Sequence, residues 1–298
     1  MIPLNIPILD QREKDAVSAV LNSGWIAAGK EVSEFEKEFA DYVGVKYAIF
    51  TNSCTAALKM AYKYFKEKGY RFYYLLEPNT YCATYSAAEE MGLLKSYISS
   101  SRIVRVSMHF GGKKQMVECD IEDSAHRIET NDPLMGLIRC YSFYATKNMT
   151  TGHGGMFVTN DEEVYERARL YWKDGLNTST QDRIKKSCEY DVILSAGGYD
   201  GNDIAAAIGR VQLCKLPRFM ELRNKIVSRY NDAFELNWEG NHLYPFTKEK
   251  GLIKHLLQYD IRCGLFYPPD GFVCLPLYPT LSREDQDFVI AKVKEYKP

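Results

Sequence analysis

The chain has 298 residues, of which 46% are hydrophobic and 26% are charged, a composition typical of globular proteins and unlike that of disordered chains. Its 38 basic and 39 acidic side chains leave a formal net charge of −1, which gives no support for nucleic acid or an anionic membrane as the main partner. No apolar run approaches the roughly 18 residues of a spanning helix, and no signal peptide is visible. We therefore expect a cytoplasmic protein with one large or two modest domains.

The hydrophobic pattern then predicts helices and strands in alternation. Two amphipathic helices come first, one beginning at Asp10 and stopped by Gly24, the other ending at Gly44. The predicted strands that follow are Tyr47–Thr51, Tyr73–Leu76, Ile103–Met108, Val117–Ile121, Ile138–Phe143 and Met156–Thr159. The predicted helices among them are Thr55–Lys68, Ala83–Met91 and Asp161–Leu176. This alternation predicts an α/β domain with a mainly parallel sheet.

The pattern changes near residue 205. Long helices begin at Ile204, and we expect Pro217 to break one from the next. Residues 240–298 read as strand, helix, strand and a last helix from Ser282. We therefore predict a large α/β domain over residues 1–205, which includes the N-terminal helical segment, and a smaller α+β domain over residues 206–298.

The eight cysteines argue against a metal site. No two of them have the CxxC spacing of a zinc ribbon. Most lie inside apolar segments, as Cys140 does, which is typical of small buried side chains in a reducing cytosol. We therefore expect no bound metal.

Polar residues follow three of the predicted strands, at the sheet edge where sites of α/β proteins form. Residues 51–55 lead directly into a helix, whose N-terminus can bind an anion. Residues 122–126 contain an acidic pair, and residues 142–147 end in a lysine before a glycine-rich turn. Each feature alone is as typical of a helix cap or an exposed lysine. Together, phosphate donors, an acid and a lysine are what a pyridoxal 5′-phosphate (PLP) site requires.

At these residues the chain resembles the DegT/StrS family of sugar aminotransferases, a group of fold-type-I PLP enzymes. The segments that carry the resemblance, in the family's order, are Ile2-Pro3-Leu4, Ser23–Ile26, Asn52–Leu58, Pro78–Thr84, Glu122–His126, Ser142–Lys147, Ala205–Gly209 and Leu275–Pro279. The chain is short for this family. The resemblance implies the fold predicted above, with PLP as the cofactor.

The resemblance also implies roles for individual residues. Lys147 would form the Schiff base and Asp123 would pair with the pyridine nitrogen, so these two are the predicted catalytic residues. The other predicted cofactor-binding residues are Ser53, Cys54, Thr55 and Ser142 at the phosphate, Tyr81 stacked on the ring, His126 beside the phenolic oxygen, and Asn202. Asn202 would replace Asp200, a carboxylate that stands where the family often has Asn or Arg, in contacting the cofactor of a neighbouring subunit.

The reaction implied by the resemblance is transfer of an amino group from L-glutamate to a keto carbon of a nucleotide-linked deoxysugar, as in polysaccharide biosynthesis, by a homodimer. Dehydratases of the family replace the lysine with histidine, so the retained Lys147 favours transamination. Two alternatives stay open: a PLP-dependent sugar dehydratase, and a non-catalytic PLP-fold protein that acts in regulation or assembly. The shortened loops and Asp200 are the features that support the second alternative.

Overall fold

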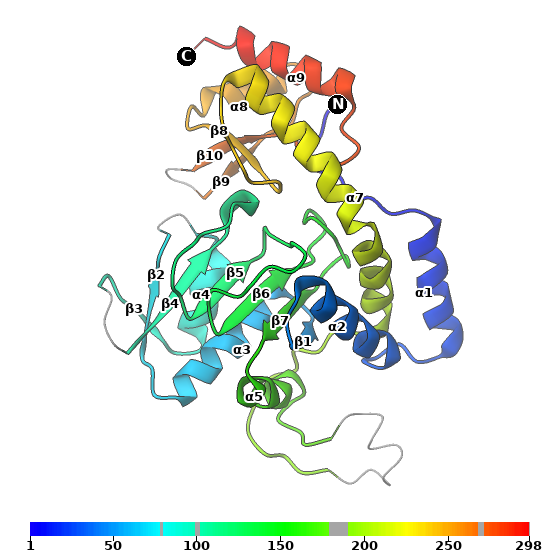
Figure 1. The fold of residues 1–298 in the computed structure, drawn as a ribbon, viewed down its shortest axis with the longest axis vertical. Helices are drawn as coiled ribbons and strands as arrows, with labels where there is room; N and C mark the ends of the chain where they lie inside the picture. Colours follow the sequence, from blue (N-terminus) through cyan, green and yellow to red (C-terminus); the bar gives the residue numbers. More distant parts are fainter. Residues whose placement is uncertain (78–79, 99–101, 179–189, 268–270, 298) are drawn as a thin grey trace.

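The computed structural model describes residues 1–77, 80–98, 102–178, 190–267 and 271–297. A seven-stranded sheet lies at the centre of the larger part of the molecule, in the order β1-β7-β6-β5-β4-β2-β3 (Figure 1). Its strands are β1 (Tyr47–Thr51), β2 (Phe72–Leu75), β3 (Leu94–Lys95), β4 (Ile103–Met108), β5 (Ile121–Ser124), β6 (Ile138–Ser142) and β7 (Gly155–Thr159). Only β7 runs antiparallel to its two neighbours, and the other pairs are parallel. The predicted α/β class with a mainly parallel sheet is therefore confirmed.

Helices cover both faces of this sheet. They are α2 (Lys30–Val43), α3 (Cys54–Glu67), α4 (Cys82–Glu90), α5 (Glu162–Trp172) and α7 (Asp203–Phe234). Successive strand side chains point to opposite faces, so Ile49 and Phe157 pack with α3, α4 and α5, whereas Phe50 and Val158 pack with α2 and α7. Burial on both faces explains why the strands read as nearly continuous apolar runs.

Strand β5 begins later than predicted. The expected strand over Val117–Ile121 is wrong, because Val117 is exposed and the strand runs from Ile121 to Ser124 instead. Glu122 inside this strand is fully buried, since Arg139 and His109 both contact its carboxylate. Glu122 and Asp123, which were predicted to follow the end of a strand, therefore lie inside the central strand β5.

Pro217 does not break α7, so that prediction is also wrong. Proline removes one backbone hydrogen bond of a helix and usually kinks or ends it. Here the helix continues on both sides of Pro217 with Leu213, Leu216 and Met220 buried against the rest of the molecule, and this packing offsets the lost bond. The helix also runs across residue 205, and the division of the chain there stays a prediction.

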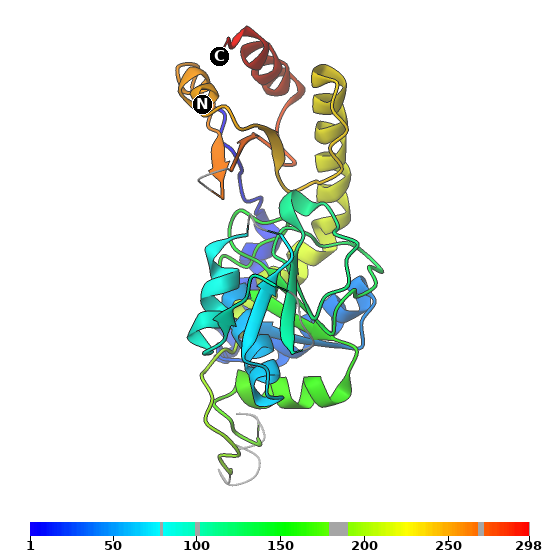
Figure 2. The same cartoon turned by 90° about the vertical axis from the view of Figure 1, so that its left-hand side faces the viewer.

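The C-terminal part has its own sheet and core. Strands β8 (Tyr244–Thr247), β10 (Phe272–Leu275) and β9 (Gly264–Phe266) form an antiparallel sheet that packs with α8 (Gly251–Leu257) and α9 (Arg283–Glu295). The second half of α7 extends from the larger part to this core (Figure 2). Among the described residues, no helix combines the length and apolarity needed to cross a membrane.

The N-terminus joins the C-terminal part. Ile2 forms a parallel bridge with Ile261: its N–H donates to the Asp260 carbonyl at 2.8 Å, and its own carbonyl accepts from the Arg262 N–H at 2.8 Å. Its side chain belongs to the C-terminal core. The chain then crosses to α1 (Gln11–Ser23), which packs on α7. A capping box formed by Asp10 and Glu13 begins this helix.

Candidate active site

A cavity of about 410 Å³ lies where α3 begins and where β5 and β6 end. Its walls include every predicted site residue except Asn202. These wall residues are Ser53, Cys54, Thr55, Tyr81, Asp123, His126, Ser142 and Lys147. The cavity lies at the carboxyl ends of parallel strands, which is the edge where ligands bind in such sheets.

One end of the cavity is formed by the N-terminus of α3. Ser53 caps this helix, because its Oγ accepts the N–H of Ala56 at 3.1 Å. The N–H groups of Cys54 and Thr55 belong to the first turn, where no partner exists within a helix, so they can donate to an anion. Gly155 lets β7 approach this turn, since a Cβ there would lie 2.4 Å from the Cys54 nitrogen.

Lys147 and Asp123 face the same cavity from neighbouring strands. Asp123 lies in β5 and is 3% exposed, and Lys147 follows β6 in a turn closed by its own N–H and the Tyr144 carbonyl at 2.9 Å. Burial lowers the pKa of Lys147 to about 8, although the negative charge of Asp123 acts in the opposite direction. A lysine with this pKa can give up its proton near neutral pH.

His126 and Tyr267 form a second wall. The N–H of Gly111, in the short 3₁₀ turn Phe110–Gly112, donates to His126 Nδ1 at 3.2 Å. In the neutral ring the proton therefore lies on Nε2, which is 3.4 Å from Tyr267 Oη. Burial, followed by the nearby charge of Lys147, lowers the pKa of His126 well below 6.5, so the ring is neutral.

Tyr267 is a wall residue that the sequence analysis did not assign. It lies in the left-handed region with φ of 61°, which is uncommon for an aromatic residue and often marks a functional position. Its ring is nearly parallel to that of His126, and its hydroxyl is the acceptor of the His126 proton. The Tyr-Pro-Pro run at residues 267–269 was the only sequence signal for it.

The two buried histidines give a pH-dependent stability. The ring of His242 lies 4.4 Å from that of His126, and burial lowers the pKa of His242 well below 6.5 too. Below pH 6.5 the unfolded chain binds one proton on each of these histidines, while the folded chain does not. The free energy of unfolding therefore decreases as the pH is lowered, by up to about 1.4 kcal/mol per pH unit for each histidine. Urea titrations at pH 7.5, 6.5 and 5.5 measure this slope.

His242→Gln is expected to reduce that slope, because one of the two protonations disappears. His153→Gln is the matched control, since His153 is exposed, and its slope should equal that of the wild type. A wild-type free energy of unfolding that does not change between pH 7.5 and 5.5 contradicts the assignment of neutral buried rings.

The remaining predicted residues take different positions. Tyr81 precedes α4 and is 57% exposed beside the cavity, with its ring 6.3 Å from that of Tyr267. Asn202 lies outside the cavity walls and caps α7, with its Oδ1 accepting the Ala205 N–H at 2.9 Å. Asp200 pairs with Lys173 at 2.7 Å, so its charge is balanced within the chain. Stacking by Tyr81 and a contact of Asn202 with a neighbouring subunit stay predictions.

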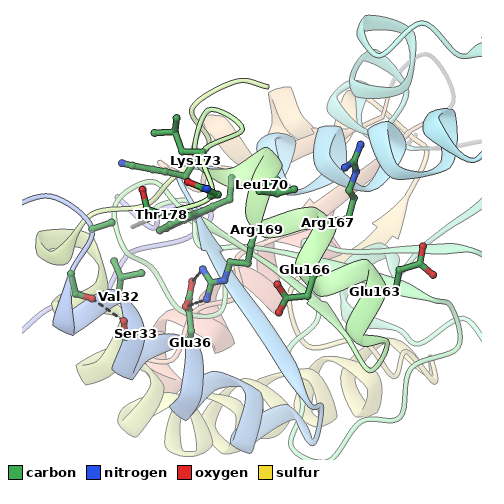
Figure 3. Close-up of a pocket in the computed structure, with 15 residues that line it drawn as sticks. Val32, Ser33, Glu36, Glu163, Glu166, Arg167, Arg169, Leu170, Lys173 and Thr178 are labelled. Atoms are coloured by element: carbon green, nitrogen blue, oxygen red, sulfur yellow. Dashed lines mark hydrogen bonds and ion pairs between the residues drawn. The ribbon is translucent and has the colours of Figure 1, made fainter. Parts of the chain in front are cut away.

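A larger cavity of about 680 Å³ lies between α2 and α5 (Figure 3). Figure 3 shows Arg169 of α5 pointing toward Glu36 of α2, and the two form an ion pair with an Nη1–Oε1 distance of 2.9 Å. Another wall residue, Arg167, pairs with Glu67. Neither Lys147 nor Asp123 reaches this cavity, so the chemistry is assigned to the smaller one.

Known proteins with similar sequences include sugar aminotransferases. The SpsC protein of Bacillus subtilis (strain 168), named for spore coat polysaccharide biosynthesis, is 27% identical over 380 residues, which cover 99% of this chain and 96% of SpsC. A dTDP-4-dehydro-2,3,6-trideoxy-D-glucose 4-aminotransferase of Saccharopolyspora spinosa is 31% identical over 271 residues, or 78% of this chain and 70% of that protein. The alignment with SpsC is longer than the 298 residues of this chain, which confirms that this chain is a shortened member of the group.

The solved structure of Helicobacter pylori PseC, an aminotransferase in the biosynthesis of pseudoaminic acid, matches with a TM-score of 0.88 at 25% identity. The match covers 99% of this chain and 98% of PseC. The profile of the DegT/DnrJ/EryC1/StrS aminotransferase family matches residues 7–101 and 121–264. These findings confirm the predicted fold type and the aminotransferase class. They also confirm PLP as the cofactor, since the matching solved structures include the PLP form of a putative sugar aminotransferase, Spr1654 of Streptococcus pneumoniae. The chain therefore belongs to the DegT/DnrJ/EryC1/StrS aminotransferase family.

Proposed function

We propose that this aminotransferase moves the amino group of L-glutamate to a keto carbon of a nucleotide-linked deoxysugar. The observation that carries the proposal is the meeting of Lys147, Asp123 and the N-terminus of α3 in one cavity. The names of relatives from Saccharopolyspora spinosa and Helicobacter pylori, which specify nucleotide-linked deoxysugars, support this class of acceptor.

The cavity residues fit PLP. The free N–H groups at the start of α3, together with the hydroxyls of Thr55 and Ser142, would hold the phosphate. The Asp123 carboxylate would meet the pyridine nitrogen, and Lys147 would carry the cofactor. When bound, PLP supplies an electron sink that makes the Cα–H bond of an amino acid acidic.

The chain itself supplies proton transfer and orientation. After the amino donor displaces it, Lys147 Nζ would take the proton from the donor Cα, and a pKa of about 8 leaves part of the lysine as the free amine near neutral pH. His126, neutral and protonated on Nε2, presents a fixed polar edge to the cavity. Tyr81 and Tyr267 add aromatic side chains to the cavity wall.

Absorbance spectroscopy tests the function directly. The purified protein, loaded with PLP, should show a cofactor band that changes when L-glutamate is added without an acceptor, because the first half-reaction stores the amino group on the cofactor. A keto nucleotide sugar should then restore the original band. Water loss from the sugar with no amino transfer would support the dehydratase alternative, and an unchanged spectrum would support the non-catalytic one.

The phosphate end of the cavity gives a binding prediction. Thr55→Ala combined with Ser142→Ala is expected to weaken PLP affinity at least about tenfold, because each hydrogen bond to a charged group contributes roughly 1.5–3 kcal/mol. Equilibrium titration with PLP measures the dissociation constant. Ser18→Ala on the exposed face of α1 is the control and should bind as the wild type does. An unchanged constant in the double variant would place the phosphate elsewhere.

We further propose a cytoplasmic homodimer. The described cysteines, Cys54, Cys82, Cys119, Cys140, Cys214, Cys263 and Cys274, are all free, which fits a reducing compartment. Sedimentation equilibrium of the loaded enzyme should give twice the 34.2 kDa chain mass, and a single-chain mass would contradict the dimer.

A further inference from the structure

Asp123 is held by a hydroxyl that the sequence analysis did not assign. Thr84, in the first turn of α4, donates its Oγ1 hydrogen to Asp123 Oδ2 at 2.6 Å. Thr84 is 0% exposed and Asp123 is 3% exposed, so water does not compete for this bond. The second carboxylate oxygen, Oδ1, accepts the Ala125 N–H at 3.0 Å. Both oxygens are therefore held, and the carboxylate cannot rotate without breaking a bond.

Thr84 is itself fixed by the core. The hydroxyl of Tyr62, a fully buried residue of α3, donates to the Thr84 carbonyl at 2.9 Å, and the Thr84 N–H donates to the Tyr81 carbonyl at 3.0 Å. A β-branched side chain has few rotamers, so an anchored backbone also fixes the hydroxyl. Among the described residues, no basic side chain forms an ion pair with Asp123 within 4.0 Å. The hydroxyl of Thr84 is thus the side-chain donor that holds this acid.

We propose that Thr84 is a positioning residue of the reaction: it aims the Asp123 carboxylate into the cavity toward the cofactor ring nitrogen. A carboxylate held beside the ring nitrogen keeps that nitrogen protonated, because the two opposite charges attract each other. This inference rests on the proposed function, because the cofactor nitrogen is the group that Asp123 serves. It adds a residue from α4 to a site otherwise assigned to strand ends and to the start of α3.

Two substitutions separate the hydroxyl from the shape of Thr84. Thr84→Val keeps the branched shape and removes the donor, whereas Thr84→Ser keeps the donor and removes a methyl group. In Thr84→Val, the absorbance of bound PLP should titrate at a higher pH than in the wild type. The ring nitrogen holds its proton less tightly, and loss of that positive charge lets the nitrogen that joins PLP to Lys147 keep its own proton to a higher pH. Its rate constant for the glutamate half-reaction should fall about tenfold to a hundredfold, with little change in KM. Thr84→Ser should restore most of both properties.

The other titratable groups around Asp123 stay the same in all these variants. They are Cys54, Tyr62, Cys140, Lys147 and Tyr267. Thr159→Val is the matched control, because Thr159 is also fully buried and its hydroxyl donates to the Leu137 carbonyl at 2.8 Å, outside the cavity. It should lower stability and leave the absorbance titration unchanged.

The outcomes distinguish this inference from the proposed function. A wild-type titration and rate in Thr84→Val would overturn the positioning role, and so would a Thr84→Ser variant as impaired as Thr84→Val. If Thr84→Val does not fold, Thr84→Cys, with its weak S–H donor, takes its place in the same comparison. A wild type that binds PLP but does not react with glutamate overturns the proposed function, while the absorbance titration still decides the role of Thr84. A wild type that does not bind PLP overturns both.

Discussion

Lys147→Ala is expected to slow the glutamate half-reaction by at least about 10⁴-fold, because the variant loses both the attachment point of the cofactor and the amine that moves the proton. The variant should also lose the covalent adduct that borohydride reduction fixes between PLP and the protein. Mass spectrometry of peptides after reduction locates the adduct, and stopped-flow absorbance gives the rate. The cavity wall stays otherwise intact, so the variant should still bind PLP non-covalently through the phosphate end of the site.

Lys113→Ala is the matched control for this experiment. Lys113 is about half exposed and pairs with Glu239 outside the cavity, so this variant should keep the adduct and the rate. An adduct on another lysine, or a Lys147→Ala variant with normal turnover, contradicts the assignment of Lys147.

Asp123→Asn should lower the half-reaction rate by about 10²–10³-fold, the loss typical when one preorganised electrostatic group of an active site is removed. The amide has the shape of the acid: its oxygen can still accept the Ala125 N–H, and its NH2 group can donate to Thr84 Oγ1 in place of the bond that Thr84 donates to the acid, so folding should be preserved. It carries no charge, however, and therefore does not hold a proton on the ring nitrogen. Rates, far-UV circular dichroism and the melting temperature measure these effects together.

Asp120→Asn provides the comparison for this variant. Asp120 precedes the same strand and pairs with Arg105 at the opposite end of β5, away from the cavity. It should show a nearly normal rate. If Asp123→Asn also turns over at a nearly normal rate, Asp123 is not the partner of the cofactor.

The sequence predicted the parts of the fold and site that depend on local pattern. Apolar runs located most strands to within a residue or two, and polar residues after β1 and β6 indicated the start of α3 and Lys147. Two errors arose where tertiary contacts override local preference. Pro217 lies in a helix held by its buried neighbours, and β5 includes Glu122 because Arg139, seventeen residues away, compensates its charge.

The unassigned site residues have the same explanation. Thr84 looked like an ordinary helix residue, and its role depends on the distance to Asp123, which lies 39 residues further along the chain. Tyr267 is separated from His126 by 141 residues, and its left-handed backbone has no signature in composition. Contacts between residues so far apart in the chain form only when the chain folds, so no local window of sequence contains them.

The bridge between Ile2 and Ile261 has a consequence for synthesis of the protein. Ile2 leaves the ribosome roughly 260 residues before its partner is made, an interval of about 13–50 s at 5–20 residues per second. During this time the large sheet can form, but the C-terminal core still lacks the strands and helices that surround Ile2. The first residues of the chain are therefore among the last to reach their native position, and a fast-folding tag fused to them would finish folding before the enzyme does.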